Sequence, residues 1–132
     1  MRPPVTLIVL FCCAVGAIRL FGADAVAAEK PGAAERGLVV FNQCAVCHGE
    51  QAADVPNPGP DLRGIVGRPP GRVSGYRYSR ALRNTRSAWT DVTLDAFIAD
   101  PQAAVPGNTM PFPGIADETE RRDLIAYLKT LK

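Results

Sequence analysis

Apolar residues recur at helical spacing in separate stretches of the chain, and this pattern predicts helices over residues 34–43, 90–99 and from residue 118 onward. A shorter helix is predicted over residues 79–84. Small and apolar side chains occupy the inward faces of the three longer helices: Gly37, Val40 and Phe41; Leu94, Phe97 and Ile98; Leu124, Ile125, Leu128 and Leu131. Asp117 caps the last helix, and Pro101 ends the one before it because the residue preceding a proline avoids the α region.

The segments between these helices are rich in residues that interrupt regular structure. Residues 49–75 hold five prolines and six glycines, too many for a helix or a strand, and predict an Ω-like wrapping segment. Residues 106–114 form a second predicted loop, and no strand pattern or internal repeat is present. The pattern therefore predicts an all-α domain of about four to five helices joined by Ω-like loops. Such a domain has few contacts between helices and needs a large apolar filler to form a core.

A chain of 132 residues is long enough for one compact domain but not for two. Hydrophobic residues make up 47% and charged residues 21%, which is the balance of a folded domain and not of a disordered one. A net charge of +2 gives no indication of a nucleic-acid partner. Seven arginines nevertheless lie between residues 63 and 86 with Asp61 as the only nearby acid, which indicates either a solvated basic loop or an anionic cofactor or partner.

The N-terminus has the pattern of an export signal. Arg2 supplies the charged start, residues 5–18 are apolar, and small residues at 23–27 offer cleavage sites. We therefore predict a signal peptide over residues 1–27 and a mature domain over residues 28–132. The alternative is an uncleaved membrane anchor, although the apolar run is shorter than the ~20 residues that a spanning helix needs, and Arg19 interrupts its extension.

The strongest chemical signal is the motif Cys44-Ala45-Val46-Cys47-His48. Two cysteines three residues apart at a helix end allow both thiols to add to the two vinyl groups of one haem. The adjacent histidine then lies under the iron, on the same side of the ring. We interpret the motif as the attachment site of a covalent c-type haem, which also supplies the apolar filler that the loop-rich domain requires.

Three other interpretations compete for two cysteines at this spacing. A redox disulfide of the thioredoxin type follows a strand in a βαβ unit, and no such pattern surrounds Cys44. A structural zinc site needs four ligands, so that a carboxylate would have to join Cys44, Cys47 and His48. A structural disulfide between the two cysteines would close so small a loop that it would contribute little stability.

The candidate axial ligands follow from what the chain contains. His48 is the only histidine, which excludes a haem held by two histidines, and Met110 is the only methionine apart from the initiator. A single methionine is often just a core residue. Met110, however, lies in the loop of residues 106–114, where prolines stiffen the backbone and glycines permit tight turns. We therefore predict His48 and Met110 as the two ligands of the iron.

The chain resembles the class I c-type cytochromes, specifically the mitochondrial and α-proteobacterial short soluble type, over residues 37–131. Beyond the motif that ends at His48, the resemblance rests on ordered matches at residues 59–68, 75–79, 89–90, 93–95, 101, 106–110 and 123–128. It implies the class I cytochrome c fold around one covalently attached haem c, and electron transfer without an enzymatic activity. Because haem attachment takes place outside the bacterial cytoplasm in this family, the resemblance also implies an exported, periplasmic protein.

The resemblance assigns roles to further residues. The carbonyl of Pro60 is expected to accept the hydrogen bond of the ligand histidine and thereby to fix its tautomer. Arg68, Tyr78 and Trp89, and more loosely Tyr76, are expected to surround the haem propionates. Five other arginines of the basic stretch are expected to face solvent: Arg72, Arg77, Arg80, Arg83 and Arg86.

Departures from the family pattern change the expected pocket and its edge. Phe97 replaces a tyrosine that usually bonds the methionine sulfur, and Leu82 replaces an asparagine near a buried water. Lysines that usually surround the exposed haem edge are missing, because their positions hold Gln43, Gln102, Ala103, Thr109 and Ala116. Electrostatic steering of partners at this edge is therefore expected to be weak.

Two protein ligands leave no open position on the iron, so the expected chemistry is one-electron transfer between larger redox enzymes. Candidate partners are quinol-cytochrome c oxidoreductase, a terminal oxidase or a periplasmic dehydrogenase. We expect a monomer with no stable membrane insertion after cleavage. A haem-dependent enzyme or a gas-binding sensor would instead require a weakly held Met110, for which the missing hydroxyl at Phe97 offers a reason.

Overall fold

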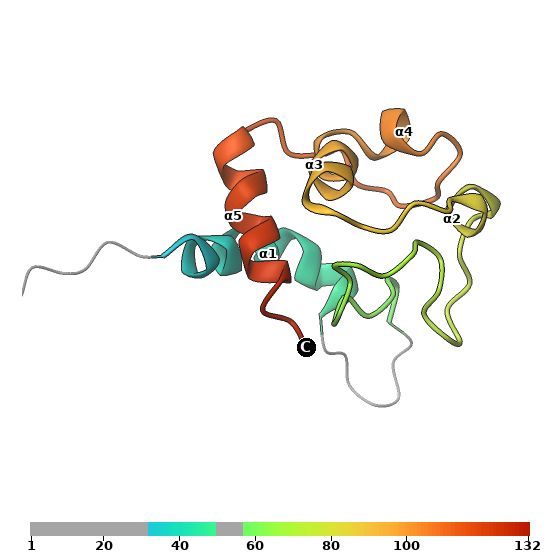
Figure 1. Cartoon of the computed structure of the whole chain (residues 1–132), viewed down its shortest axis with the longest axis horizontal. Helices are drawn as coiled ribbons and strands as arrows, with labels where there is room; N and C mark the ends of the chain where they lie inside the picture. Colours follow the sequence, from blue (N-terminus) through green and yellow to red (C-terminus); the bar gives the residue numbers. More distant parts are fainter. Residues whose placement is uncertain (1–31, 50–56) are drawn as a thin grey trace, which may run out of the picture.

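The computed structural model describes residues 32–49 and 57–132, and within these ranges the chain forms five helices and no strand (Figure 1). In chain order they are α1 (Ala33–His48), α2 (Arg80–Asn84), α3 (Asp91–Ala99), α4 (Pro101–Ala104) and α5 (Glu118–Leu128). The predicted all-α class with about four to five helices is therefore confirmed. The predicted signal peptide, residues 1–27, lies outside the described residues.

The first and last helices cross at a point where their backbones nearly touch (Figure 1). Gly37 of α1 makes this possible, because a Cβ atom built on it would lie 1.9 Å from the backbone oxygen of Asp123 in α5. The rings of Phe41 and Tyr127 pack beside the crossing with their centroids 5.0 Å apart. The Arg36 guanidinium of α1 forms a bidentate ion pair with Asp123 of α5, at 2.6 and 2.8 Å, and so links the two helices.

Buried apolar side chains from α1, α3, α5 and the loops form one core. Its members are Phe41, Ile65, Trp89, Leu94, Phe97, Ile98, Ile115, Leu124, Ile125 and Leu128. No helix or strand occurs between residues 57 and 79, as the breakers predict, and the backbone of this segment is tied to the core near Trp89. Gly67 donates to the carbonyl of Trp89 at 2.7 Å, and Trp89 donates to that of Arg68 at 3.0 Å.

Two helix boundaries differ from the sequence prediction. The first helix was expected to end at residue 43, but α1 continues to His48, where the Gly49 amide donates to the carbonyl of Ala45. The helix α4 was not predicted at all, because Pro101 was interpreted only as a stop. Proline is also favoured in the first turn of a helix, and Asp100 caps that turn by accepting from the amides of Gln102 and Ala103. No helix within the described residues is long and apolar enough to cross a membrane.

Candidate functional site

A cavity of about 430 Å³ opens between α1, α3, α5 and the loops before and after α3. Its wall is mostly apolar and includes core residues such as Leu94, Ile98 and Leu124. The structure brings all nine predicted site residues to this one wall: Cys44, Cys47, His48, Pro60, Arg68, Tyr76, Tyr78, Trp89 and Met110. Residues that are far apart in the sequence therefore meet around a single space.

The last turns of α1 present Cys44, Cys47 and His48 to the cavity. Residues three apart on a helix lie on the same face, so the two thiols line the wall one above the other. Cys44 and Cys47 form no disulfide with each other or with another described residue. Burial raises the pKa of the Cys44 thiol above its usual value, and the neighbouring Cys47 raises it further. Within the described residues, no three side chains of His, Cys, Asp or Glu are grouped so as to hold a metal ion.

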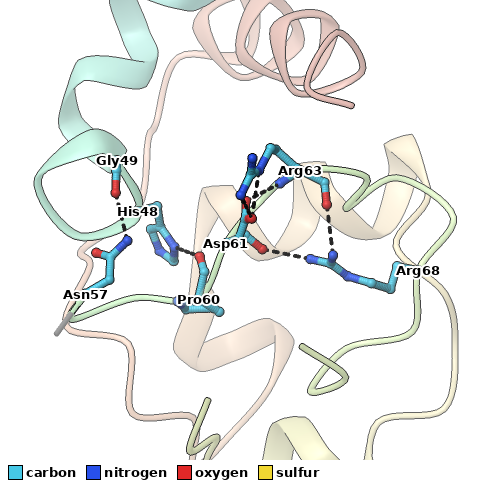
Figure 2. A network of polar contacts seen from close by, with 7 residues as sticks. All are labelled: His48, Gly49, Asn57, Pro60, Asp61, Arg63 and Arg68. Carbon is cyan, nitrogen blue, oxygen red and sulfur yellow. Dashed lines mark hydrogen bonds and ion pairs between the residues drawn. The ribbon is translucent and has the colours of Figure 1, made fainter. Parts of the chain in front are cut away.

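The orientation of the His48 ring is fixed from the loop that faces α1. Its Nδ1 lies 2.7 Å from the carbonyl oxygen of Pro60 (Figure 2). A carbonyl can only accept, so Nδ1 carries the proton and Nε2 is left with its lone pair. Gly59 makes this approach possible, because a Cβ atom built there would lie 2.7 Å from the ring. A histidine held in this tautomer is prepared to ligate a metal through Nε2.

Arg68 holds the Pro60 loop in shape (Figure 2). Its guanidinium donates to the carbonyl oxygens of Arg63, at 2.8 Å, and Asp61, at 2.9 Å, while it lines the cavity. The Arg63 guanidinium and amide bind the Asp61 carboxylate and hold its pKa below the usual value. Asn57 ties the same loop to the end of α1 by donating to the carbonyl of Gly49 at 2.7 Å. The loop that orients His48 is thus braced on both sides.

Aromatic side chains form the wall on the side of Arg68. Tyr76 donates its hydroxyl proton to the carbonyl of Pro58 at 2.8 Å and meets the ring of Tyr78 edge to face, at 4.8 Å between centroids. Trp89 is buried and packs on Phe97 at 4.9 Å. Burial raises the pKa of the Tyr78 hydroxyl, and a hydrogen bond with the Val73 backbone only partly offsets this effect. Tyr78 is therefore neutral and available to donate.

Met110 reaches the cavity from the loop after α4. Asn108 of this loop, which positions Met110, was not identified from the sequence. The buried Asn108 accepts from the backbone amide of Met110 at 2.9 Å through its side-chain oxygen. Its side-chain amide donates to the carbonyls of Pro101, at 2.7 Å, and Val105, at 2.9 Å. These bonds fix the backbone of Met110 to the start and the end of α4. An asparagine two residues before a loop methionine was the available signal, because Asn side chains commonly bond the backbone two residues on.

Both departures from the family pattern lie on the cavity wall, as Phe97 and Leu82 line it. Neither side chain carries a polar atom, so both make this part of the wall apolar. The five arginines that were expected to face solvent are all exposed: Arg72, Arg77, Arg80, Arg83 and Arg86. The five positions without lysine are exposed as well: Gln43, Gln102, Ala103, Thr109 and Ala116.

Comparison with known proteins identifies the family. The family model described as cytochrome c matches residues 34–132 of the chain. The chain belongs to the cytochrome c family. It is 38% identical to cytochrome c2 of Rhodomicrobium vannielii over 116 residues, which cover 88% of this chain and 90% of that one. It is 44% identical to cytochrome c of Euglena viridis over 102 residues, covering 76% and 99%.

A solved structure of another cytochrome c matches the fold of this chain. Cytochrome cH from Methylobacterium extorquens is 40% identical, with a TM-score of 0.68, covering 75% of this chain and 99% of that one. The resemblance to a class I c-type cytochrome and the predicted fold are thereby confirmed. Cytochromes c carry one covalently attached c-type haem and transfer electrons, so this cytochrome is an electron carrier with one such haem.

The described residues fit this haem. A mostly apolar cavity receives a flat macrocycle, two thiols at the required spacing line it, and a histidine with its Nε2 lone pair free lies beside them. A thioether is supplied from a different loop of the same wall. The arrangement can therefore bind, orient and desolvate a haem. When bound, the haem supplies the one-electron redox chemistry.

Proposed function

We propose that this cytochrome is a periplasmic one-electron carrier whose haem is attached through Cys44 and Cys47 and ligated by His48 and Met110. The observation that carries the proposal is the 2.7 Å contact between His48 Nδ1 and the Pro60 carbonyl, which leaves Nε2 as the metal-binding nitrogen of a cavity that Met110 also lines. With both axial positions held by the chain, no open position is left for oxygen or a substrate.

The remaining site residues tune and shield the centre. The apolar wall around Leu94, Phe97 and Ile98 keeps water from the iron and disfavours the more highly charged ferric form. Arg68, Tyr78 and Trp89 bind the haem propionates, whose charges would be costly to bury unpaired, and Tyr76 holds the adjacent loop through its bond to Pro58. The carbonyl of Pro60 keeps the ring of His48 in the ligating tautomer.

Export supports the same function. Residues 1–27 have the pattern of a signal peptide, and cleavage leaves a cytochrome domain of residues 28–132. The named relatives include a bacterial cytochrome c2. In the periplasm the monomeric protein exchanges electrons with quinol-cytochrome c oxidoreductase, a terminal oxidase or a dehydrogenase. Docking relies on contacts other than a lysine ring, because the five haem-edge positions are exposed and uncharged.

A redox titration tests the carrier function. The purified protein, poised at a series of potentials and followed in the visible haem bands, is expected to give one reversible transition with the slope of one electron. Rapid reoxidation by dissolved oxygen, with the oxygen consumed in step, would instead mean that the iron reacts with small molecules. The same titration on Met110→Ala serves as the comparison with an opened axial position.

Fractionation tests the location. The full chain, expressed with the bacterial haem-attachment machinery, is expected in the periplasmic fraction with its N-terminus near residues 26–28. A haem protein retained in the membrane fraction with residues 1–27 intact would establish the anchor alternative.

A further inference from the structure

A second pocket lies outside the haem cavity, where the basic stretch folds back on itself. It has a volume of about 340 Å³ and is lined by Pro69, Arg72, Arg83, Asn84 and Arg86. Only Pro69 also lines the haem cavity, so the two spaces are separate and share one wall. Three arginines and one asparagine line this pocket, and no acidic residue does. Every charged group of the lining is positive.

The charge of this pocket is not neutralised by neighbouring acids. Four ion pairs occur in the described part of the chain, and their cations are Arg36, Arg63, Arg121 and Lys129. Arg72 and Arg86 make no hydrogen bond or ion pair with any described residue. The guanidinium of Arg83 donates only to the carbonyl of Tyr78, a neutral acceptor. Three like charges around one space repel each other, and a bound anion relieves that repulsion.

The two segments that carry these arginines are held at both ends. At one end, Trp89 exchanges backbone hydrogen bonds with Gly67 and Arg68. At the other end, Gly71 packs so closely on the second segment that an added Cβ atom would lie 2.9 Å from the carbonyl oxygen of Leu82. The frame of the pocket is therefore formed before any ligand binds, which lowers the cost of binding.

We propose that this pocket binds a multivalent oxyanion of the phosphate class, with Arg72 and Arg86 as its principal ligands. Guanidinium groups match phosphate oxygens with paired hydrogen bonds, and Asn84 adds a neutral donor to the lining. The volume of about 340 Å³ is sufficient for a group with one or two phosphates. The proposal is independent of electron transfer, because none of its ligands lines the haem cavity.

The chain offers a matched control. Arg77 and Arg80 belong to the same basic stretch and are equally exposed, but they do not line the pocket. The double variant Arg72→Gln/Arg86→Gln therefore removes the proposed ligands, whereas Arg77→Gln/Arg80→Gln makes the same change in net charge nearby. Arg83 is left in place because its bond to Tyr78 supports the fold.

Calorimetry of the haem-loaded protein with inorganic diphosphate, at a fixed ionic strength of about 0.15 M, tests the proposal. The wild type is expected to bind one diphosphate, the Arg72/Arg86 variant roughly tenfold or more weakly, and the Arg77/Arg80 variant within about twofold of the wild type. If both variants bound diphosphate with equally weakened affinity, the loss would follow from net charge alone, and the proposed site would be wrong.

A second experiment, with lipid vesicles, distinguishes a lipid headgroup from a free anion as the source of the phosphate group. Co-sedimentation with phosphatidylglycerol vesicles that depends on Arg72 and Arg86, in a protein that does not bind diphosphate, would assign the phosphate to a lipid headgroup. Diphosphate binding without vesicle binding would assign it to a free anion. If the wild type bound neither probe, the proposal would be wrong.

Discussion

The side-chain oxygen of Asn108 accepts a hydrogen bond from the backbone amide of Met110 at 2.9 Å. The same side chain donates to the carbonyls of Pro101 and Val105, so one buried amide group holds both ends of α4 and the residue proposed to ligate the iron. A ligand on a loop stays in place only as well as its backbone does. The position of Met110 therefore depends on the hydrogen bonds of Asn108 as much as on the strength of the proposed bond between its sulfur and the iron.

Substitution Asn108→Ala is expected to loosen Met110. It leaves the backbone amide of Met110 without its partner and removes one of the two hydrogen bonds that each of the Pro101 and Val105 carbonyls accepts, which should lower the free energy of unfolding by about 1–3 kcal/mol. Transient loss of Met110 should also raise the rate of carbon monoxide binding to the ferrous protein, by roughly tenfold for each 1.4 kcal/mol by which the closed state is weakened. Flash photolysis and denaturant unfolding measure the two effects.

The control for this experiment is Gln102→Ala. The side chain of the exposed Gln102 donates only to the backbone carbonyl of Asn108, at 3.2 Å, so its removal should leave carbon monoxide binding close to that of the wild type. A faster reaction in Gln102→Ala than in Asn108→Ala would contradict the role given to Asn108.

Arg68 is expected to raise the reduction potential. A positive charge near the propionates disfavours the ferric state, so Arg68→Gln should lower the potential by roughly 40 mV, which corresponds to about 1 kcal/mol for a one-electron couple. Arg68→Lys keeps the charge but loses the bonds to the carbonyls of Asp61 and Arg63. Its reduction potential should therefore lie between those of the wild type and Arg68→Gln. Arg77→Gln makes the same charge change at an exposed position outside the cavity. If it shifted the potential as much as Arg68→Gln, the local role of Arg68 would be refuted.

Acid stability should depend on Asp123. The hydrogen bonds and charge of Arg36 lower the pKa of this carboxyl in the folded protein, so the stability it contributes is complete above its unfolded pKa, near about 4, and is lost as the pH falls through the lower folded value. Asp123→Asn should therefore be less stable than the wild type at neutral pH, with a difference that shrinks in acid. Denaturant unfolding at a series of pH values measures it.

The exposed pair of Lys129 and Asp91 provides the comparison for Asp123, since both side chains are about half exposed, at 47% and 56%. Surface pairs of this kind contribute little, so Asp91→Asn should change the stability by about 0–1 kcal/mol. A difference between wild type and Asp123→Asn that stayed constant from neutral pH into acid would contradict the account of the Arg36 pair.

Association with redox partners should depend weakly on salt. The five haem-edge positions that commonly carry lysine are exposed and uncharged: Gln43, Gln102, Ala103, Thr109 and Ala116. Stopped-flow electron exchange with an isolated quinol-cytochrome c oxidoreductase measures the rate as ionic strength increases. Double replacement of Gln43 and Thr109 by Lys should restore a salt dependence, because charged edges steer diffusional encounter. A steep fall of the wild-type rate with salt would contradict the expected docking mode.

Local patterns predicted four of the five helices of the described residues, and the motif that ends at His48 predicted that Cys44, Cys47 and His48 belong to one site. The inward positions Leu94, Phe97 and Ile98 are buried in α3. Ser79 and Thr90, the predicted first residues of two helices, are their N-caps and lie one residue before each helix begins. Breakers between residues 57 and 75 predict the wrapping loop, because prolines and glycines at this density disrupt a regular helix or strand. Met110, the single methionine apart from the initiator, lines the same cavity as the motif that ends at His48.

The sequence did not predict three features of the structure, because local patterns favour no single outcome at these places. The sequence prediction ended the first helix at residue 43, because the apolar spacing it used ends at Phe41, whereas α1 continues to His48. Pro101 can end one helix and begin the next, and only the capping by Asp100 decides that it does both. The brace formed by Arg68 depends on the path of the loop, which brings two carbonyls within reach of one guanidinium.

The most direct test of His48 and Met110 ligation is the optical spectrum of the purified protein, oxidised and reduced, followed by addition of carbon monoxide. The account predicts a covalent haem with the weak near-infrared charge-transfer band of methionine-ligated ferric haem, and a ferrous spectrum that carbon monoxide does not change. Absence of that band, or rapid carbon monoxide binding by the wild type, would mean that Met110 does not hold the sixth position and would contradict the closed, electron-carrying centre.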